Sequence, residues 1–263
     1  MRRLDWADYR TTEYETIDAE RTIAILPTAA IEQHGPHLPT GTDTMIAEGM
    51  LAQLRDACPD HLDIRILPVQ AVGKSNEHIH APGTLTLSAQ TALAAWQEIG
   101  LSVARAGVRK VVIVNSHGGN LDLISILARE LRVRAGMLAI KCQWGAFGYP
   151  DGMYAAHENA YGIHGGDVET SLMLHFRPET VDMNAAVMNR STAEETAISP
   201  IGSISYGWVS SDLNPNGTVG DASIATAEKG AATCDHQVMG FIGLLEKVVA
   251  TPLDRFAPTM PAI

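Results

Sequence analysis

Several side chains of metal-ligating types lie in one short segment near the N-terminus, residues 30–44, which reads AIEQHGPHLPTGTDT. They are Glu32, His34, His37 and Asp43. Imidazole and carboxylate donors together suit zinc, manganese or iron. Pro36 and Pro39 stiffen the segment, which lowers the entropy lost when its donors are ordered. Any one of these residues alone is typical of a polar surface loop, but the cluster predicts a site for divalent metal.

A second segment, residues 115–120, reads NSHGGN and directly follows an apolar run. His117 in this segment is a further candidate ligand. Gly118 and Gly119 have no side chains, so the backbone here can approach a bound ion closely and can offer its amides to a substrate. The alternative is a structural turn in which Asn120 caps the following helix, and the two roles are compatible.

A third segment, residues 164–171, reads HGGDVETS. Asp167 and Glu169 are expected in the first turn of a helix, where the helix dipole favours carboxylates. One of them could instead point into the site as a ligand, and the spacing leaves open which one. His164 is either an acid that protonates a leaving group or a residue that orients a ligand carboxylate.

Other polar and aromatic residues are weaker candidates. His78 and His80 could contact substrate, and His157 and Glu158 could line a neighbouring loop. A set of aromatic side chains either walls a substrate pocket or fills contacts between subunits. This set is Trp144, Tyr149, Tyr154, Tyr206 and Trp208.

The elements that position these residues are predicted from apolar runs and helical spacing. Strands are predicted at residues 22–27, 64–72, 110–115 and 137–143, and helices at 44–57, 88–105, 121–135, 167–176 and 222–249. The strands are continuously apolar, which is typical of a parallel sheet covered on both faces. Ser88 is a predicted N-cap, and Gly107 and Gly136 follow helix ends. The fold class is therefore α/β, a single three-layer αβα domain with a mainly parallel sheet.

In such a fold, ligands bind beyond the carboxyl ends of the strands. Glu32 and His34 follow the first predicted strand, His78 follows the second and His117 follows the third. The candidate residues thus collect at the edge where chemistry is expected. Residues 189–220, rich in Ser, Asn, Pro and Gly, are predicted to form a long functional or interface loop.

Length and composition limit the class of protein. The 263 residues are predicted to form one domain, residues 1–263, and the formal charge of -11 argues against nucleic acid as a partner. No apolar run is long enough to span a bilayer, the N-terminal residues lack the features of a signal peptide, and three scattered cysteines indicate a reducing compartment. A cytoplasmic protein is expected. The glycine pattern GxGxxG and a Walker lysine are both missing, which argues against a nucleotide-binding module.

The three motifs, together with APGTLTLS at residues 81–88, resemble the creatininase family of amidohydrolases. The resemblance implies a three-layer α/β fold, two divalent metal ions per chain and hydrolysis of a carbon–nitrogen bond in a cyclic or other small amide. The ions would be Zn²⁺ or Mn²⁺, with Fe²⁺ also possible. The resemblance further implies a homohexamer that acts on a small-molecule substrate.

The resemblance also implies a set of ligands. Glu32, Asp43 and His117 match the ligands of one ion, and His34 matches a ligand of the other, with Asp43 bridging the two. Creatininase itself has a glutamate ligand where this sequence has Gly119, which argues against creatinine as substrate. The sequence is closer here to other branches of the family, a formamide hydrolase and the peptidase of the mycofactocin precursor. In those branches Glu169 is the natural replacement ligand.

The expected reaction is attack on an amide carbonyl by a water that the two ions activate. His164 and Glu169 are the predicted catalytic residues, and His78, Gly118 and Gly119 the predicted substrate contacts. Cyclic amides, imides and formamides are the expected substrates, as for enzymes that cleave carbon–nitrogen bonds other than peptide bonds. Two alternatives stay open, a peptidase of the mycofactocin-precursor type and a metal-binding scaffold without catalysis.

Overall fold

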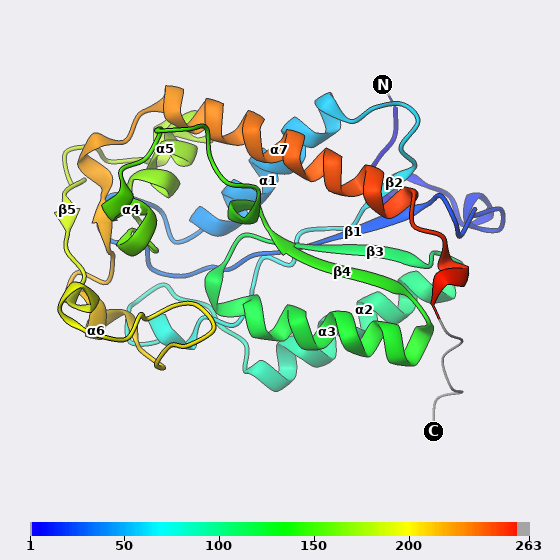
Figure 1. Ribbon diagram of the computed structural model, residues 1–263, viewed down its shortest axis with the longest axis horizontal. Helices are drawn as coiled ribbons and strands as arrows, with labels where there is room; N and C mark the ends of the chain where they lie inside the picture. The colour runs from blue at the N-terminus through cyan, green and yellow to red at the C-terminus, as the bar shows by residue number, and fades with distance from the viewer. Residues whose placement is uncertain (1, 257–263) are drawn as a thin grey trace.

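A parallel sheet forms the centre of the protein across residues 2–256, which the computed structural model describes (Figure 1). Its strands are β1 (Ile23–Thr28), β2 (Ile64–Ile66), β3 (Lys110–Asn115) and β4 (Leu138–Gln143). They are hydrogen-bonded in the order β2-β1-β3-β4, and every pairing is parallel. All six residues of β1 and all six of β3 are buried. The continuous apolar character of these strands thus reflects a sheet that is covered on both faces.

Helices cover both faces of this sheet (Figure 1). The helices α1 (Thr42–Ala57), α5 (Asp167–Phe176) and α7 (Ala227–Val249) lie on one side, and α2 (Ala89–Arg105) and α3 (Leu121–Ala135) lie on the other. Alternate residues of β1 point to different layers, because Ile23 and Ile25 pack in the core with α1 and α7, whereas Ala24 and Leu26 pack in the core with α2 and α3. The predicted three-layer αβα fold is confirmed.

Short elements gather beyond the carboxyl ends of the sheet (Figure 1). They are α4 (Ala156–Tyr161), β5 (Met188–Asn189), α6 (Ser210–Leu213) and β6 (Gly220–Asp221). β5 and β6 pair antiparallel, and Val219 bridges back to His164. Residues 189–220 were expected to be a long loop, and the structure forms them mostly as loop with these brief elements inserted.

Most predicted elements agree with the structure to within two residues, but two predictions were wrong in extent. The strand predicted at residues 64–72 ends at Ile66, and beyond it Gln70 makes an isolated bridge to Thr28. Pro68 has no amide hydrogen to donate to a ladder, which fits this early end. The helix predicted at residues 222–249 begins at Ala227, where the Thr226 side chain accepts the Lys229 amide, after a separate 3₁₀ turn.

The amino end of the sheet contains a buried lysine. Lys110, the first residue of β3, is fully buried, and its ammonium donates to the carbonyls of Val248, Val249 and Thr251 at 2.7–3.1 Å. These carbonyls belong to the C-terminal end of α7, where a cation satisfies acceptors that the helix leaves unpaired. The lysine therefore ties α7 to the central strand.

Among residues 2–256, no helix combines the length and the apolar character needed to cross a membrane. The extent of the domain, residues 1–263, stays a prediction.

Candidate metal centre

Four separate segments bring charged side chains together beyond the carboxyl ends of β1 and β3. Glu32 and His34 lie in the loop after β1, and Asp43 is the second residue of α1. His117 follows β3, and Glu169 lies in the first turn of α5. Because β1 and β3 are neighbours in register, the loops that leave them meet at the same edge. Glu32, His34, Asp43 and His117 are each no more than 5% exposed.

Asp43 lies between two histidines. Its Oδ1 is 3.5 Å from Nε2 of His34, and its Oδ2 is 3.3 Å from Nδ1 of His117. The two oxygens of one carboxylate thus face two different imidazoles. A carboxylate placed in this way can serve two neighbouring cations at once, as carboxylates do in two-metal hydrolytic sites.

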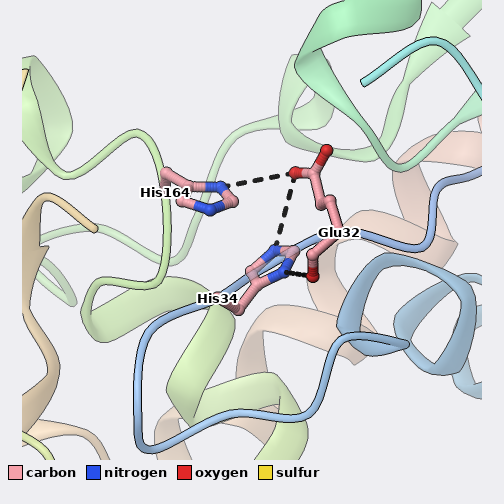
Figure 2. A group of neighbouring side chains, drawn as sticks. All are labelled: Glu32, His34 and His164. Carbon is pink, nitrogen blue, oxygen red and sulfur yellow. Dashed lines mark hydrogen bonds and ion pairs between the residues drawn. The ribbon is translucent and has the colours of Figure 1, made fainter. Parts of the chain in front are cut away.

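Each histidine is also close to a second carboxylate. Nδ1 of His117 lies 3.2 Å from Oε1 of Glu32, and Nε2 of His34 lies 3.8 Å from Oε2 of Glu169. Oε1 of Glu32 is also 4.0 Å from His34 and 3.5 Å from His164 (Figure 2). Among the described residues, four donor sets have their atoms within 4.8 Å of one another. Two of them share Asp43, namely Glu32 with Asp43 and His117, and His34 with Asp43 and Glu169. The other two are Glu32 with His34 and His164, and Glu32 with Glu77 and His78.

The two histidine rings are oriented by backbone groups on their far sides. Nδ1 of His34 donates to the carbonyl of Glu32 at 3.1 Å, so Nε2 faces the carboxylates (Figure 2). Nε2 of His117 donates to the carbonyl of Lys74 at 3.0 Å, so Nδ1 faces them. A hydrogen bond to the outer nitrogen fixes which nitrogen is free to bind a metal.

The electrostatics show how strongly these groups interact. Burial lowers the pKa of His34, but the nearby carboxylates, Asp43 first, outweigh it and raise the pKa to about 10. Burial likewise opposes the charge on His117, yet Glu32 and Asp43 hold its pKa well above the ordinary value. The pKa of Glu169 is raised to about 7, mainly by burial. Burial also opposes ionisation of Asp43, but His34 and His117 bring the pKa of Asp43 below its usual range.

The buried polar atoms of this cluster fit divalent cations. Both carboxylate oxygens of Glu32, Nε2 of His34 and Oδ2 of Asp43 have no hydrogen-bond partner within residues 2–256. A buried polar atom without a partner costs about 1–3 kcal/mol, more when charged, so four of them in one place need a compensating ligand. Mixed imidazole and carboxylate donors are the ligands that zinc, manganese and iron take in proteins.

The two acidic residues at the start of α5 point in different directions. Glu169 faces His34 and accepts the Gly165 amide at 2.5 Å. Asp167 instead accepts from Lys229 at 2.6 Å and from Ser171 at 3.0 Å. Glu169 is therefore the carboxylate of this turn that points into the site, a choice that the spacing of the two residues alone left open.

Comparison with known proteins places the chain in a family. A family model described as creatinine amidohydrolase matches residues 7–245. The chain belongs to the creatininase family. The mycofactocin precursor peptide peptidase of Mycobacterium ulcerans is 32% identical over 214 residues, which cover 78% of this chain and 77% of that one. The creatinine amidohydrolase of Pseudomonas putida is 27% identical over 204 residues, 70% of this chain and 74% of its own.

Solved structures of the creatininase family share the fold. A creatininase with manganese matches with a TM-score of 0.69 at 23% identity, over 94% of this chain and 97% of the other. The resemblance that the motifs predicted is therefore confirmed.

Within this family, the departure at Gly119 now has a structural basis. A Cβ atom at Gly119 would lie 1.9 Å from Oε1 of Glu77 and 2.4 Å from Nε2 of His117. The Glu77 carboxylate thus occupies the space that a side chain at position 119 would need, and a ligand from that position is excluded. The carboxylate near His34 comes from Glu169 instead.

Glu77 itself was missed by the sequence analysis. Its Oε1 lies 3.3 Å from Nε2 of His117, on the side away from Asp43, and its Oε2 accepts from Lys74 at 2.7 Å. Burial opposes its charge, but the hydrogen bond with His117 and the neighbouring cations lower its pKa to about 2. The signal in the sequence was its place in NEHIH beside His78, which alone does not distinguish it from a surface glutamate.

Two further histidines, His78 and His164, stack beside the centre. Their rings lie 4.3 Å apart with planes at 28°, and the His164 ring is 4.2 Å from that of His34. Burial, followed by the positive charge of His34, lowers the pKa of His78 to about 3 and that of His164 well below its ordinary value. Both rings are therefore neutral near pH 7.

Other candidates lie outside this cluster. His37 contacts the Gly165 carbonyl and Thr170 instead of a carboxylate, and His80 is exposed. Glu158 accepts the backbone amides of Asp167 and Asp221, and His157 lies 3.1 Å from Glu194. The helix-capping role considered for Asn120 was wrong, because its side chain bonds to Ala29, Asn115 and the Lys74 amide instead.

A cavity of about 390 Å³ lies next to the centre on the Glu77 side. Its lining includes Lys74, Glu77, Trp208 and Asp212. Trp208 also meets the edge of the His78 ring at 6.5 Å, so the cavity adjoins the stacked histidines. Trp144, by contrast, packs against Phe241 in the core. A side chain at Gly118 would meet no described atom within 4 Å, so this part of the backbone is open.

Proposed function

We propose that this protein is a metal-dependent hydrolase that cleaves a carbon–nitrogen amide bond with the help of two divalent ions. The observation that carries the proposal is the position of Asp43, whose two oxygens face His34 and His117 separately. Glu32 would complete the ligands of one ion, and Glu169 those of the other. Manganese and zinc are the metals to test first, since solved creatininases include manganese and Zn–Zn forms.

Bound at these residues, the ions would supply a water of lowered pKa and would polarise the substrate carbonyl. Side chains of the protein would transfer the proton and contact the substrate. Nδ1 of His164 lies on the Glu32 side of the centre, where it can take a proton from the attacking water and give it to the departing nitrogen. His78 and the open backbone at Gly118 would contact the carbonyl oxygen of the substrate. Gly119, the third predicted contact, is packed against Glu77.

The substrate class has two candidates. The first is a small amide, such as a lactam, an imide or a formamide, which a cavity of about 390 Å³ could hold. The second is a short peptide, favoured by the 32% identity with a mycofactocin precursor peptide peptidase. Creatinine is disfavoured, because the Glu77 carboxylate fills the space at Gly119.

The test is hydrolysis of a panel of lactams, imides, formamides and short peptides by protein loaded with Mn²⁺ or Zn²⁺. Activity that disappears on chelation and returns with metal supports the proposal. A protein that binds two ions and hydrolyses nothing in the panel would instead support a metal-binding scaffold. The His164→Ala variant separates the two roles of this residue, since loss of turnover with full metal content supports proton transfer and loss of metal supports a positioning role.

We further propose a homo-oligomer, with a hexamer as the state implied by the family, and a cytoplasmic location. Exposed apolar side chains, among them Ile79, Leu85, Ile201 and Ile204, offer surface for subunit contacts. Size-exclusion chromatography with light scattering tests this assembly, and a monomer at micromolar concentration would contradict it.

A further inference from the structure

Gln33, between the candidate ligands Glu32 and His34, has a side chain whose orientation two backbone groups define. Its Oε1 accepts the Gly35 amide at 3.0 Å, and its Nε2 donates to the Gly217 carbonyl at 2.7 Å. Exchanging the oxygen and the nitrogen would place two acceptors together at Gly217 and two donors together at Gly35. The amide nitrogen therefore faces the stacked histidines.

This nitrogen lies within hydrogen-bonding distance of both rings. It is 2.8 Å from Nδ1 of His78 and 3.1 Å from Nε2 of His164, and one of its two hydrogens is already used by Gly217. Nε2 of His164 also lies 2.7 Å from the main-chain carbonyl of Gln33, which can accept but cannot donate. Nε2 of His164 thus carries a hydrogen, and the second amide hydrogen of Gln33 goes to Nδ1 of His78.

The two rings then present different nitrogens to the centre. His78, with Nδ1 accepting, carries its hydrogen on Nε2, which lies 3.5 Å from Oε1 of Glu32. His164, with its hydrogen on Nε2, turns Nδ1 toward the same oxygen, also at 3.5 Å. Both rings are buried, and they stack on each other with their centroids 4.3 Å apart.

We propose that Gln33 is a positioning residue for two histidines on one side of the metal centre. Its side chain holds His78 so that Nε2 of that ring can donate a hydrogen bond, and its main-chain carbonyl holds His164 so that Nδ1 of that ring can accept one. The catalytic roles that follow from this inference rest on the proposed hydrolase function. His164 would take the proton of the attacking water at Nδ1 and release it to the leaving nitrogen, so an O–H bond breaks and an N–H bond forms. His78 would donate to the carbonyl oxygen as negative charge develops there.

The test is to determine which ring nitrogens carry hydrogen by solid-state NMR. Protein labelled with ¹³C,¹⁵N-histidine is studied before and after zinc loading, and His78→Asn and His164→Asn variants assign the two rings. In the wild type we expect hydrogen on Nε2 and none on Nδ1 in both rings. A protonated Nδ1 on His78 would overturn the proposal without any variant.

Variants of Gln33 test its role directly. In Gln33→Glu the carboxylate can only accept, so hydrogen should move to Nδ1 of His78, whereas His164, held by the main-chain carbonyl, should keep its hydrogen on Nε2. In Gln33→Met, His78 should show a mixture of tautomers, and kcat should fall about tenfold with the zinc content unchanged. Gln237→Met is the matched control, because Gln237 is a buried glutamine that donates to Gly148, and it should change neither ring.

An unchanged His78 ring in Gln33→Glu would contradict the inference. This failure is distinguishable from failure of the proposed function. If Gln33 positions the rings, a protein that hydrolyses no amide would still carry hydrogen on Nε2 of His78. If the inference is wrong, an active enzyme could carry this hydrogen on Nδ1 instead.

Discussion

The two ends of the central sheet each contain buried charged groups, but the two sets of groups differ in whether their polar atoms have hydrogen-bond partners. At the amino end, the Lys110 ammonium donates to three backbone carbonyls, so its hydrogens have acceptors supplied by the fold itself. At the carboxyl end, Glu32, His34 and Asp43 bury charged or polar atoms that make no hydrogen bond within residues 2–256. The charged groups at both ends lose hydration when they are buried. Hydrogen bonds to the backbone compensate for this loss only at the Lys110 end.

This difference separates a structural charge from a functional one. A charge satisfied by the backbone stabilises the fold and needs nothing from solution. A cluster of carboxylates and imidazoles whose atoms face one another without hydrogen bonds is arranged for a ligand with the opposite requirement, a small cation. The comparison therefore makes distinct predictions for the two ends.

The largest expected effect is loss of activity on removing the bridging charge. Asp43→Asn should lower kcat/KM about a thousandfold and reduce the metal bound per chain, because one oxygen that faces a histidine becomes an amide nitrogen. The matched control is Asp167→Asn, a buried carboxylate nearby that pairs with Lys229. Elemental analysis and kinetics check both. An Asp43→Asn enzyme that keeps both ions and full activity would break the comparison.

The second prediction concerns the opposite end. Lys110→Met should lower the free energy of unfolding by about 3 kcal/mol, because three carbonyls, that of Val248 buried and those of Val249 and Thr251 part-buried, lose their donor. Metal content and KM should stay unchanged. Urea denaturation of the metal-loaded protein measures the effect, with Lys141→Met, an exposed lysine of β4, as control. Loss of metal from Lys110→Met would show that the two ends are not independent.

The third prediction tests the packing behind His117. Gly119→Ala places a Cβ atom 1.9 Å from the Glu77 carboxylate and 2.4 Å from Nε2 of His117, so both side chains must shift and their contact is disturbed. Metal affinity should fall about tenfold, since the partner that orients a ligand histidine is displaced. Gly118→Ala, where the added atom meets nothing within 4 Å among the described residues, should bind metal normally. Competition with a fluorescent chelator measures both, and equal affinities would contradict this role for Glu77.

The fourth prediction concerns the pH dependence of metal binding by the unchanged protein. His34, with a pKa raised to about 10, keeps its proton at neutral pH, and Glu169, with a pKa raised to about 7, is partly protonated there. Because cations bind the unprotonated groups, affinity should rise with pH through 7 and on toward 10, by about tenfold per unit for each proton displaced. Calorimetry in buffers of different ionisation enthalpy counts the released protons. Binding without proton release would contradict these pKa shifts.

Much of the fold could be predicted from the sequence, because β1 and β3 are continuously apolar and α2 begins after a recognisable cap, Ser88. The candidate ligands could be named because their motifs are compact. The direction of Asp167 and Glu169 could not, since both lie in one helical turn and tertiary contacts decide which faces His34. The position of Glu77 was equally hidden, because its fit depends on the empty space left by Gly119.

The central claim is that the carboxyl end of the sheet binds two cations that share Asp43. Anomalous diffraction from crystals of the protein loaded with Zn²⁺ or Mn²⁺ tests it most directly. The account predicts two metal peaks per chain on either side of the Asp43 carboxylate, one beside Glu32 and His117 and the other beside His34 and Glu169. A single peak, no peak, or ions that do not contact Asp43 in fully loaded crystals would contradict it.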